Sequence, residues 1–248
     1  MRLFPQINRS AASAAMTDEE EETPSGFRFA SSGCSEAGPC REVNEDHLLD
    51  AGEHGLWAVA DGMGGHRDGG RAARSSLDAI ANAAKTQDSI PQALKTVNAA
   101  LYAEGLSLGT IGATIAVLQI KKDKYQCIWA GDCRIYRLRD QTLSALTHDH
   151  SEVNQLIRSG LISLEEAATH PLRNIVTRAI GAHENIELEV SEGTVQPKDI
   201  FFLCTDGLTN TLSENHIISL RANARDLVLK AVSKGAKDNV TALSVAIS

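Results

Sequence analysis

The sequence predicts a single α+β domain built around antiparallel β-sheets, and three observations lead to this fold class. Short apolar runs rich in β-branched and aromatic residues recur along the chain and end at turn residues, as in 56–60 and 200–205, a pattern typical of buried strands. The stretches with helical spacing come in pairs and do not alternate with single strands, which disfavours a βαβ repeat. No linker or internal repeat interrupts residues 26–248, so we expect one domain there.

The first half of this domain is expected to hold most of the strands and one helix pair. Apolar residues recur every three or four positions in 70–85 and 91–104, which predicts two helices. Asp88-Ser89-Ile90-Pro91 between them offers capping side chains and a proline suited to a first helical turn. Strands are expected at 27–31, 55–60, 112–120, 124–130 and 135–139.

The second half is expected to be more helical. A mainly helical stretch is predicted over 151–180, with a break at His170-Pro171 because proline disfavours helix at the residue before it. Strands at 186–190, 200–205 and 240–247 and helices at 213–220 and 224–234 complete the prediction.

Residues 1–25 predict a disordered tail. The run Asp18-Glu19-Glu20-Glu21-Glu22 repels itself, and the segment offers little apolar surface to bury. We see no continuous apolar stretch that would act as a signal peptide. We therefore expect a cytoplasmic protein.

Composition excludes several classes of function. The net charge is −8, with 24 basic and 32 acidic residues, so the chain lacks the basic surface that nucleic-acid binding needs. Apolar stretches such as 115–118 are far shorter than the roughly 20 residues of a membrane helix. The five cysteines include no CxxC pair, which disfavours structural zinc, and their odd number without a secretory signal disfavours a disulfide framework.

Four acidic sites lie at the ends of predicted strands. Three apolar runs lead into Asp61-Gly62, Gly131-Asp132 and Asp206-Gly207, and Asp238-Asn239 directly precedes the last strand. Any one of these pairs is explained by an ordinary turn, in which aspartate binds its own backbone. The repetition favours a second explanation. If the strand ends meet, clustered carboxylates require a hard divalent cation such as Mg²⁺ or Mn²⁺.

Six ordered motifs resemble those of the metal-dependent protein serine/threonine phosphatases of the 2C type, in their bacterial single-domain branch. The resemblance runs from about residue 27 to the C-terminus. The motifs are Arg41-x-x-Asn44-Glu45-Asp46, Val59-Ala60-Asp61-Gly62-Met63-Gly64-Gly65-His66, Gly112-Ala113-Thr114, Ala130-Gly131-Asp132-Cys133-Arg134-Ile135-Tyr136, Thr205-Asp206-Gly207-Leu208 and Asp238-Asn239-Val240-Thr241.

The resemblance implies a sandwich of two antiparallel β-sheets flanked by α-helices on both faces. It also implies hydrolysis of phosphoserine and phosphothreonine in proteins by water activated at a dinuclear Mg²⁺ or Mn²⁺ centre. The resemblance implies that Asp61 bridges both ions, that Asp46 and the Gly62 carbonyl bind one of them, and that Asp206 and Asp238 bind the other. Asp132, with Asp206, is implied to hold a third, weaker ion. Glu45 is implied to act through metal-bound water, and Arg41 to clamp the substrate phosphate.

This sequence departs from the family pattern at two places. Where many eukaryotic members have a histidine taken as the general acid, this chain has Met63. His66 is the nearest replacement, and it is equally well explained as a surface group of the loop. Cys133 replaces the usual serine beside Asp132, a possible oxidation point, and Arg134 is expected to fix its own loop.

The segment 161–174 resembles the mobile flap beside the active site of bacterial members. Without the resemblance, it would be an ordinary helix pair packed on the core. His170 within it is expected to cap the helix or bind nearby backbone.

Two other functions remain open from the residues alone. One is a phosphoprotein-binding relative without activity, which the retained carboxylates disfavour. The other is a metal-dependent phosphodiesterase acting on small molecules. The resemblance implies a phosphorylated protein as partner, a serine/threonine kinase or one of its targets. The composition predicts no nucleic acid and no membrane as partner, and we expect a monomeric enzyme.

Overall fold

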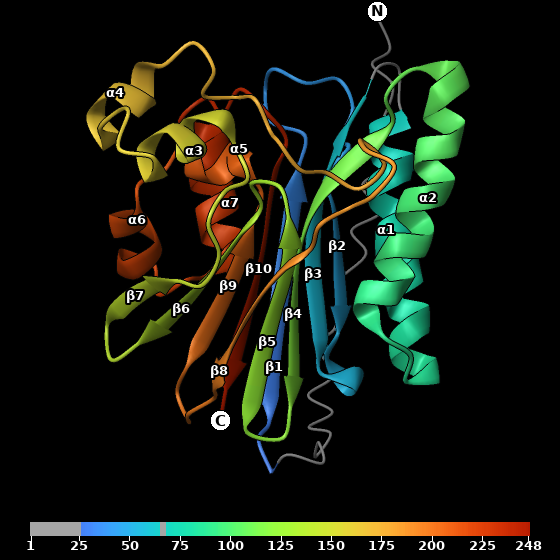
Figure 1. The fold of residues 1–248 in the computed structure, drawn as a ribbon. Helices are drawn as coiled ribbons and strands as arrows, with labels where there is room; N and C mark the ends of the chain where they lie inside the picture. The colour runs from blue at the N-terminus through green and yellow to red at the C-terminus, as the bar shows by residue number, and fades with distance from the viewer. Residues whose placement is uncertain (1–25, 65–67) are drawn as a thin grey trace, which may run out of the picture.

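The computed structural model describes residues 26–64 and 68–248. Two five-stranded antiparallel sheets pack face to face, and helices cover the outer face of each sheet (Figure 1). The expected α+β sandwich is therefore confirmed. The predicted tail, residues 1–25, lies outside the described residues.

The first sheet has the strand order β1-β10-β9-β6-β7. Its strands are β1 (Phe29–Glu36), β10 (Val240–Ile247), β9 (Ile200–Cys204), β6 (Arg134–Arg139) and β7 (Thr142–Ala145). The second sheet has the order β2-β3-β4-β5-β8. Its strands are β2 (His47–Ala51), β3 (Leu56–Met63), β4 (Gly112–Lys121), β5 (Lys124–Ala130) and β8 (Glu189–Thr194).

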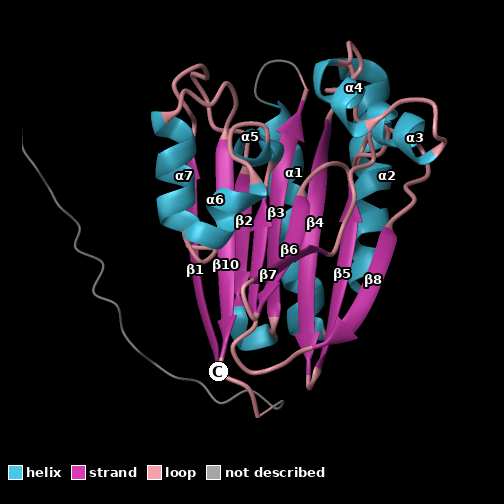
Figure 2. Cartoon of the chain, turned by 90° about the vertical axis from the view of Figure 1, so that its left-hand side faces the viewer, coloured by secondary structure: helices cyan, strands magenta, loops and turns pink. Residues whose placement is uncertain are grey.

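Two long helices cover the second sheet, and shorter helices cover the first (Figures 1 and 2). Helices α1 (Asp68–Thr86) and α2 (Ile90–Leu108) pack small and branched side chains on β3 and β4. Helices α5 (Asp206–Thr209), α6 (Glu214–Ser219) and α7 (Ala224–Ser233) pack on β9 and β10. The core between the sheets is built on large side chains that include Trp57, Trp129 and Phe201.

The strands that were missed or misplaced from the sequence are those at the sheet edges. β2 and β7 were not predicted, β1 extends to Glu36 through a segment expected to be a loop, and β8 begins three residues later than expected. The segment EVSEGT alternates between half-buried and exposed residues, and FASSGCSE mixes the two with no fully buried position. An edge strand shares only one neighbour, so it needs little apolar sequence to hold its place.

The predicted helical stretch 151–180 is mostly wrong. Only α3 (Glu152–Arg158) and α4 (Leu164–Thr169) are helical, and α4 ends at His170 before Pro171. Ser151 and Ser163 cap the two helices through side-chain hydrogen bonds from Asn154 and Glu166 backbone N–H groups. After the proline, Val176 pairs with Ser151 at the start of α3 and Ile180 pairs with Ala113 of β4, so tertiary pairing overrides helical spacing.

Within the described part of the chain, no helix combines the length and the apolar character that crossing a membrane requires.

Candidate active site

Strand pairing brings five aspartates to one end of the sandwich. In the second sheet the start of β2 lies beside the end of β3 through the pair His47–Ala60, and Asp61 pairs with Thr114 at the start of β4. In the first sheet the start of β10 lies beside the end of β9. Because antiparallel neighbours alternate in direction, the acidic ends meet at the same edge. We call this set the carboxylate cluster: Asp46, Asp61, Asp132, Asp206 and Asp238.

Glycines let backbone segments approach closely around this cluster. A Cβ on Gly62 would lie 2.2 Å from the Gly69 carbonyl carbon, which fixes the end of β3 against the first turn of α1. A Cβ on Gly207 would lie 1.9 Å from the Asn239 carbonyl oxygen, and this contact joins α5 to the start of β10. Only glycine fits at either position.

Asp46 is the most deeply buried member of the cluster. It is 3% exposed, and its Oδ2 accepts a 2.8 Å hydrogen bond from the Thr205 hydroxyl. Its Oδ1 has no hydrogen-bond partner among the described residues. Burial, and then the nearby charges of Asp206 and Asp238, raise the pKa of Asp46 to about 7 despite the threonine hydrogen bonds.

Burial and neighbouring carboxylates also raise the pKa values of three other members of the cluster. Burial raises the pKa of Asp61 well above its usual value, and Asp46, Asp206 and Asp132 raise it further. Burial and the charge of Asp206 raise the pKa of Asp132 to about 7. The pKa of Asp206 is also raised, chiefly by burial and the charge of Asp238, although its Oδ2 accepts a hydrogen bond from the Asn210 side chain. Like charges at this range repel unless a counter-charge lies among them.

The cluster fits a divalent cation. Two buried carboxylate oxygens, Asp46 Oδ1 and Asp206 Oδ1, lack hydrogen-bond partners among the described residues, and a buried polar atom without a partner is costly. The donors are all oxygens, which suit Mg²⁺ and Mn²⁺. Protein cations do not fill this role, because within the described chain the only arginine or lysine within 4 Å of a cluster carboxylate is Arg41 at Asp238.

Arg41 and Glu45 lie on the loop between β1 and β2, at the rim of the cluster. Arg41 is half-exposed, and its Nη2 donates a 2.8 Å hydrogen bond to Asp238 Oδ2. The pKa of Arg41 is raised, first by that hydrogen bond. Glu45 Oε1 accepts a long, 3.4 Å hydrogen bond from the backbone N–H of Gly70 in α1.

Two asparagines that sequence reasoning gave no role hold this loop in place. Asn239 is 5% exposed, and its side chain bonds three backbone groups of the loop, accepting from Glu45 N–H and donating to the carbonyls of Ala37 and Val43 at 2.9–3.0 Å. Asn44 accepts a hydrogen bond from Asp46 N–H and donates to the Ser35 hydroxyl. The available signal was their place inside the acidic motifs, directly beside Asp46 and Asp238.

Arg134 and Cys133 support the turn that carries Asp132. Arg134 forms two parallel 2.7 Å hydrogen bonds with the Asp149 carboxylate, so it fixes its own loop as expected. Cys133 is 1% exposed and lies 3.1 Å from the Thr114 hydroxyl. Burial raises the pKa of the Cys133 thiol well above its usual value, which opposes formation of the reactive thiolate.

The remaining sequence predictions concern loops. His66 lies outside the described residues. His170 ends α4, and its Nδ1 accepts a hydrogen bond from the backbone N–H of Leu172, the local capping role expected for it. Leu161 and Leu164 in the expected flap are 70% and 76% exposed, so these two side chains do not pack on the core.

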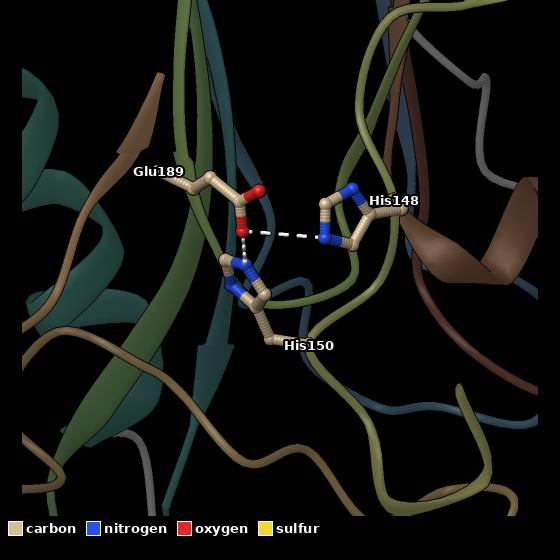
Figure 3. A group of neighbouring side chains, drawn as sticks. All are labelled: His148, His150 and Glu189. Atoms are coloured by element: carbon tan, nitrogen blue, oxygen red, sulfur yellow. Dashed lines mark hydrogen bonds and ion pairs between the residues drawn. The ribbon is translucent and has the colours of Figure 1, made fainter. Parts of the chain in front are cut away.

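A second group of metal-type ligands lies beside the cluster but does not fit a cation. His148, His150 and Glu189 converge, as Figure 3 shows. The backbone N–H of Gly131 donates to His150 Nδ1 at 3.1 Å, so the ring hydrogen sits on Nε2, which donates to Glu189 Oε2 at 2.8 Å. Two guanidinium groups already lie where a cation would bind, since Arg158 Nη1 lies 2.7 Å from His148 Nε2 and Arg178 Nη1 lies 3.4 Å from His150 Nε2.

Comparison with known proteins identifies the class. A sequence model of the family "Protein phosphatase 2C" matches residues 41–237. The serine/threonine phosphatase stp of Listeria welshimeri is 33% identical over 234 residues, covering 85% of this chain and 93% of that protein. PstP of Mycobacterium tuberculosis is 31% identical over 222 residues, covering 84% of this chain and 43% of that protein.

Solved structures agree. PppA, described as a key regulatory component of T6SS in Pseudomonas aeruginosa, superposes with a TM-score of 0.80 at 36% identity and covers 89% of this chain and 98% of that chain. The PstP catalytic domain in complex with two manganese ions gives a TM-score of 0.79 at 26% identity, covering 89% and 99% of the two chains.

The fold and the carboxylate cluster thus define a metal-dependent phosphatase. This chain belongs to the protein phosphatase 2C family, alongside the bacterial serine/threonine phosphatases that it resembles over most of its length.

Proposed function

We propose that this enzyme hydrolyses phosphoserine and phosphothreonine in proteins and so reverses the action of serine/threonine kinases. The observation that carries the proposal is the carboxylate cluster, where Asp46 Oδ1 and Asp206 Oδ1 are buried without hydrogen-bond partners among the described residues. Mg²⁺ or Mn²⁺ ions bound there lower the pKa of water and neutralise charge on the phosphate.

The residues divide into ligands and substrate groups. Asp46, Asp61 and the Gly62 carbonyl would hold one ion, and Asp61, Asp206 and Asp238 would hold a second. Asp132, with Asp206, would hold a third and weaker ion. The raised pKa values of Asp46, Asp61, Asp132 and Asp206 support the binding of cations among them, since a cation would stabilise the ionised carboxylates.

Arg41 and Glu45 act on the substrate side. Arg41 is exposed on one side and anchored to Asp238 on the other, which suits a clamp that offers further N–H groups to a phosphate. One carboxylate oxygen of Glu45 accepts the hydrogen bond from Gly70 N–H, and the other is proposed to orient water. His66 is the proposed general acid, as a histidine near neutral pKa suits that task.

The partner is a phosphorylated protein, either a serine/threonine kinase or a kinase target, and the enzyme acts as a monomer. We place the enzyme in the cytoplasm, where such kinases act on their targets.

Activity on phosphopeptides tests this proposal. We expect the purified chain to release phosphate from a phosphothreonine peptide with Mn²⁺ and to leave a small phosphodiester intact. Chelation should stop release, and added Mn²⁺ should restore it. Release that is unaffected by chelation, or faster cleavage of the diester, would contradict the proposal.

Substitution of Arg41 tests the clamp. Arg41→Ala should raise KM for the phosphopeptide by roughly 10- to 100-fold, because a charge-assisted hydrogen bond is worth about 1.5–3 kcal/mol. Arg41→Lys keeps the charge without the planar fork, so its KM should lie between those of the wild type and Arg41→Ala. A lower kcat with unchanged KM would contradict the role.

A further inference from the structure

A hollow lies on the surface beside β8, the edge strand of the second sheet. It is a groove of about 650 Å³ between α2, α3 and β8. Its walls carry Pro91 and Lys95 of α2, Arg158 at the end of α3, Arg178 and residues 186–190. We call it the α2–β8 groove.

Two of the three cations in this groove lack a carboxylate partner. Arg178 lies 3.4 Å from Glu187 and 3.7 Å from Glu189. Within the described part of the chain, neither Lys95 nor Arg158 has an acidic group within 4 Å. Both are exposed side chains. The groove therefore presents positive charge that the protein itself does not neutralise.

The contact made by Arg158 is a mismatched one. Arg158 Nη1 lies 2.7 Å from His148 Nε2, so that nitrogen must accept a hydrogen bond from the arginine. The same His148 Nε2 lies 3.2 Å from Glu189 Oε2 (Figure 3). If His148 Nε2 accepts a hydrogen bond from Arg158, its lone pair is repelled by the Glu189 carboxylate. If it instead carries a hydrogen toward Glu189, that hydrogen is repelled by the Arg158 N–H group.

His150 cannot resolve this conflict. It already donates its Nε2 hydrogen to Glu189, because Gly131 N–H occupies its Nδ1. The conflict ends when an external anion accepts hydrogen bonds from Arg158, since His148 Nε2 is then free to carry a hydrogen toward Glu189. The arrangement thus favours a ligand that bears negative charge at Arg158.

A smaller hollow extends from this groove toward the active site. It shares Arg158, Arg178 and Glu189 with the groove and also includes Asp149 and His150. His150 bonds both backbone groups of Gly131, the residue before Asp132. The smaller hollow therefore reaches the residue that holds the turn carrying Asp132.

We propose that the α2–β8 groove binds an anionic side chain of the phosphoprotein substrate, a carboxylate or a second phosphate, through Arg158 and Lys95. The inference rests on the proposed function, because it assigns the groove to the same substrate. Glu187 and Glu189 on one wall limit the site to a short anionic segment, since longer ones would meet like charge.

Three fluorescent peptides test the groove. One has a phosphothreonine with glutamine flanks, the second replaces these flanks by glutamates, and the third carries a second phosphoserine. The wild type should bind the two anionic peptides more tightly. In R158Q/K95Q this preference should fall about tenfold, because two exposed charge contacts are lost. Fluorescence anisotropy with metal-free protein measures binding apart from turnover, and KM measured with Mn²⁺ should change in parallel.

The matched control is K121Q/K124Q, which makes the same charge change at the β4–β5 hairpin. Its peptide preference should equal that of the wild type. Turnover of an aryl phosphate, which has no flanks, should be the same in all three proteins. Equal preference in R158Q/K95Q and the control would overturn the groove assignment. Failure of the wild type to hydrolyse any of these phosphates would instead overturn the proposed function, while the anisotropy would still report on the groove.

Discussion

Asp61→Asn is expected to abolish phosphopeptide hydrolysis while leaving the fold intact. Asparagine has the same shape, and the β3–β4 pairing between residue 61 and Thr114 depends on backbone groups alone. What is lost is the charge that both ions would share. Changes to residues that merely orient metal ligands cost 10- to 100-fold, so loss of a bridging carboxylate should lower kcat/KM by at least ~10²-fold.

The same substitution should stabilise the metal-free protein. Asp61 is repelled by Asp46, Asp206 and Asp132, and burial raises its pKa well above the usual value. Asparagine is neutral without binding a proton, so the cost of burying or neutralising residue 61 disappears, and the melting temperature without metal at pH 7.5 should rise by several degrees. Gain of stability together with loss of activity is typical of a strained functional site.

Asp50→Asn is the matched control for this variant. Asp50 lies exposed on the edge strand β2 and accepts a hydrogen bond from Ser31, which an amide oxygen also accepts. Its kinetics and Mn²⁺ binding, measured by titration calorimetry, should equal those of the wild type. Near-normal turnover in Asp61→Asn would remove Asp61 from the site.

The fold was most predictable where strands are central. β3, β4, β5 and β9 have neighbours on both sides and buried faces, so their sequences are nearly continuous apolar runs. The edge strands are held by pairing with those central strands, and their own sequences carry little signal. The turn after α4 is likewise held by backbone bonds such as Glu152 N–H to the Ile175 carbonyl, which no local pattern reveals.

The candidate site was predictable for a related reason. Carboxylates placed at strand ends can be read from the sequence, because the strands themselves can. The roles of Thr205 and Asn239 were not predicted from the sequence. Thr205 binds Asp46, and Asn239 binds the backbone of the loop between β1 and β2, some 200 residues away in the sequence. The partnership of Arg158 with His148 depends equally on tertiary placement. Hydrogen bonds between segments far apart in the chain produce no repeating pattern in the sequence from which they could be predicted.

The metal-free protein is expected to lose stability as the pH rises from about 4 to 7. The folded pKa of both Asp46 and Asp132 is about 7, against an ordinary value of 3.8. Across this window the folded chain holds protons that the unfolded chain has released, so the free energy of unfolding falls with rising pH. We expect a decrease in melting temperature of about 5 °C or more between pH 5 and pH 7.5.

Two comparisons isolate the carboxylates in this experiment. Burial lowers the pKa of His150, which by itself makes stability rise with pH below about 6.5, but this contribution is the same in Asp46→Asn. The variant keeps an acceptor for the Thr205 hydroxyl and loses a titrating group, so its melting temperature should decline less steeply than that of the wild type. Saturating Mn²⁺ at pH 7.5 should raise the wild-type melting temperature, because only the folded chain binds it well. Parallel pH profiles for the wild type and Asp46→Asn would show that the buried carboxylate costs the fold nothing, and the electrostatic basis of the metal site would then be wrong.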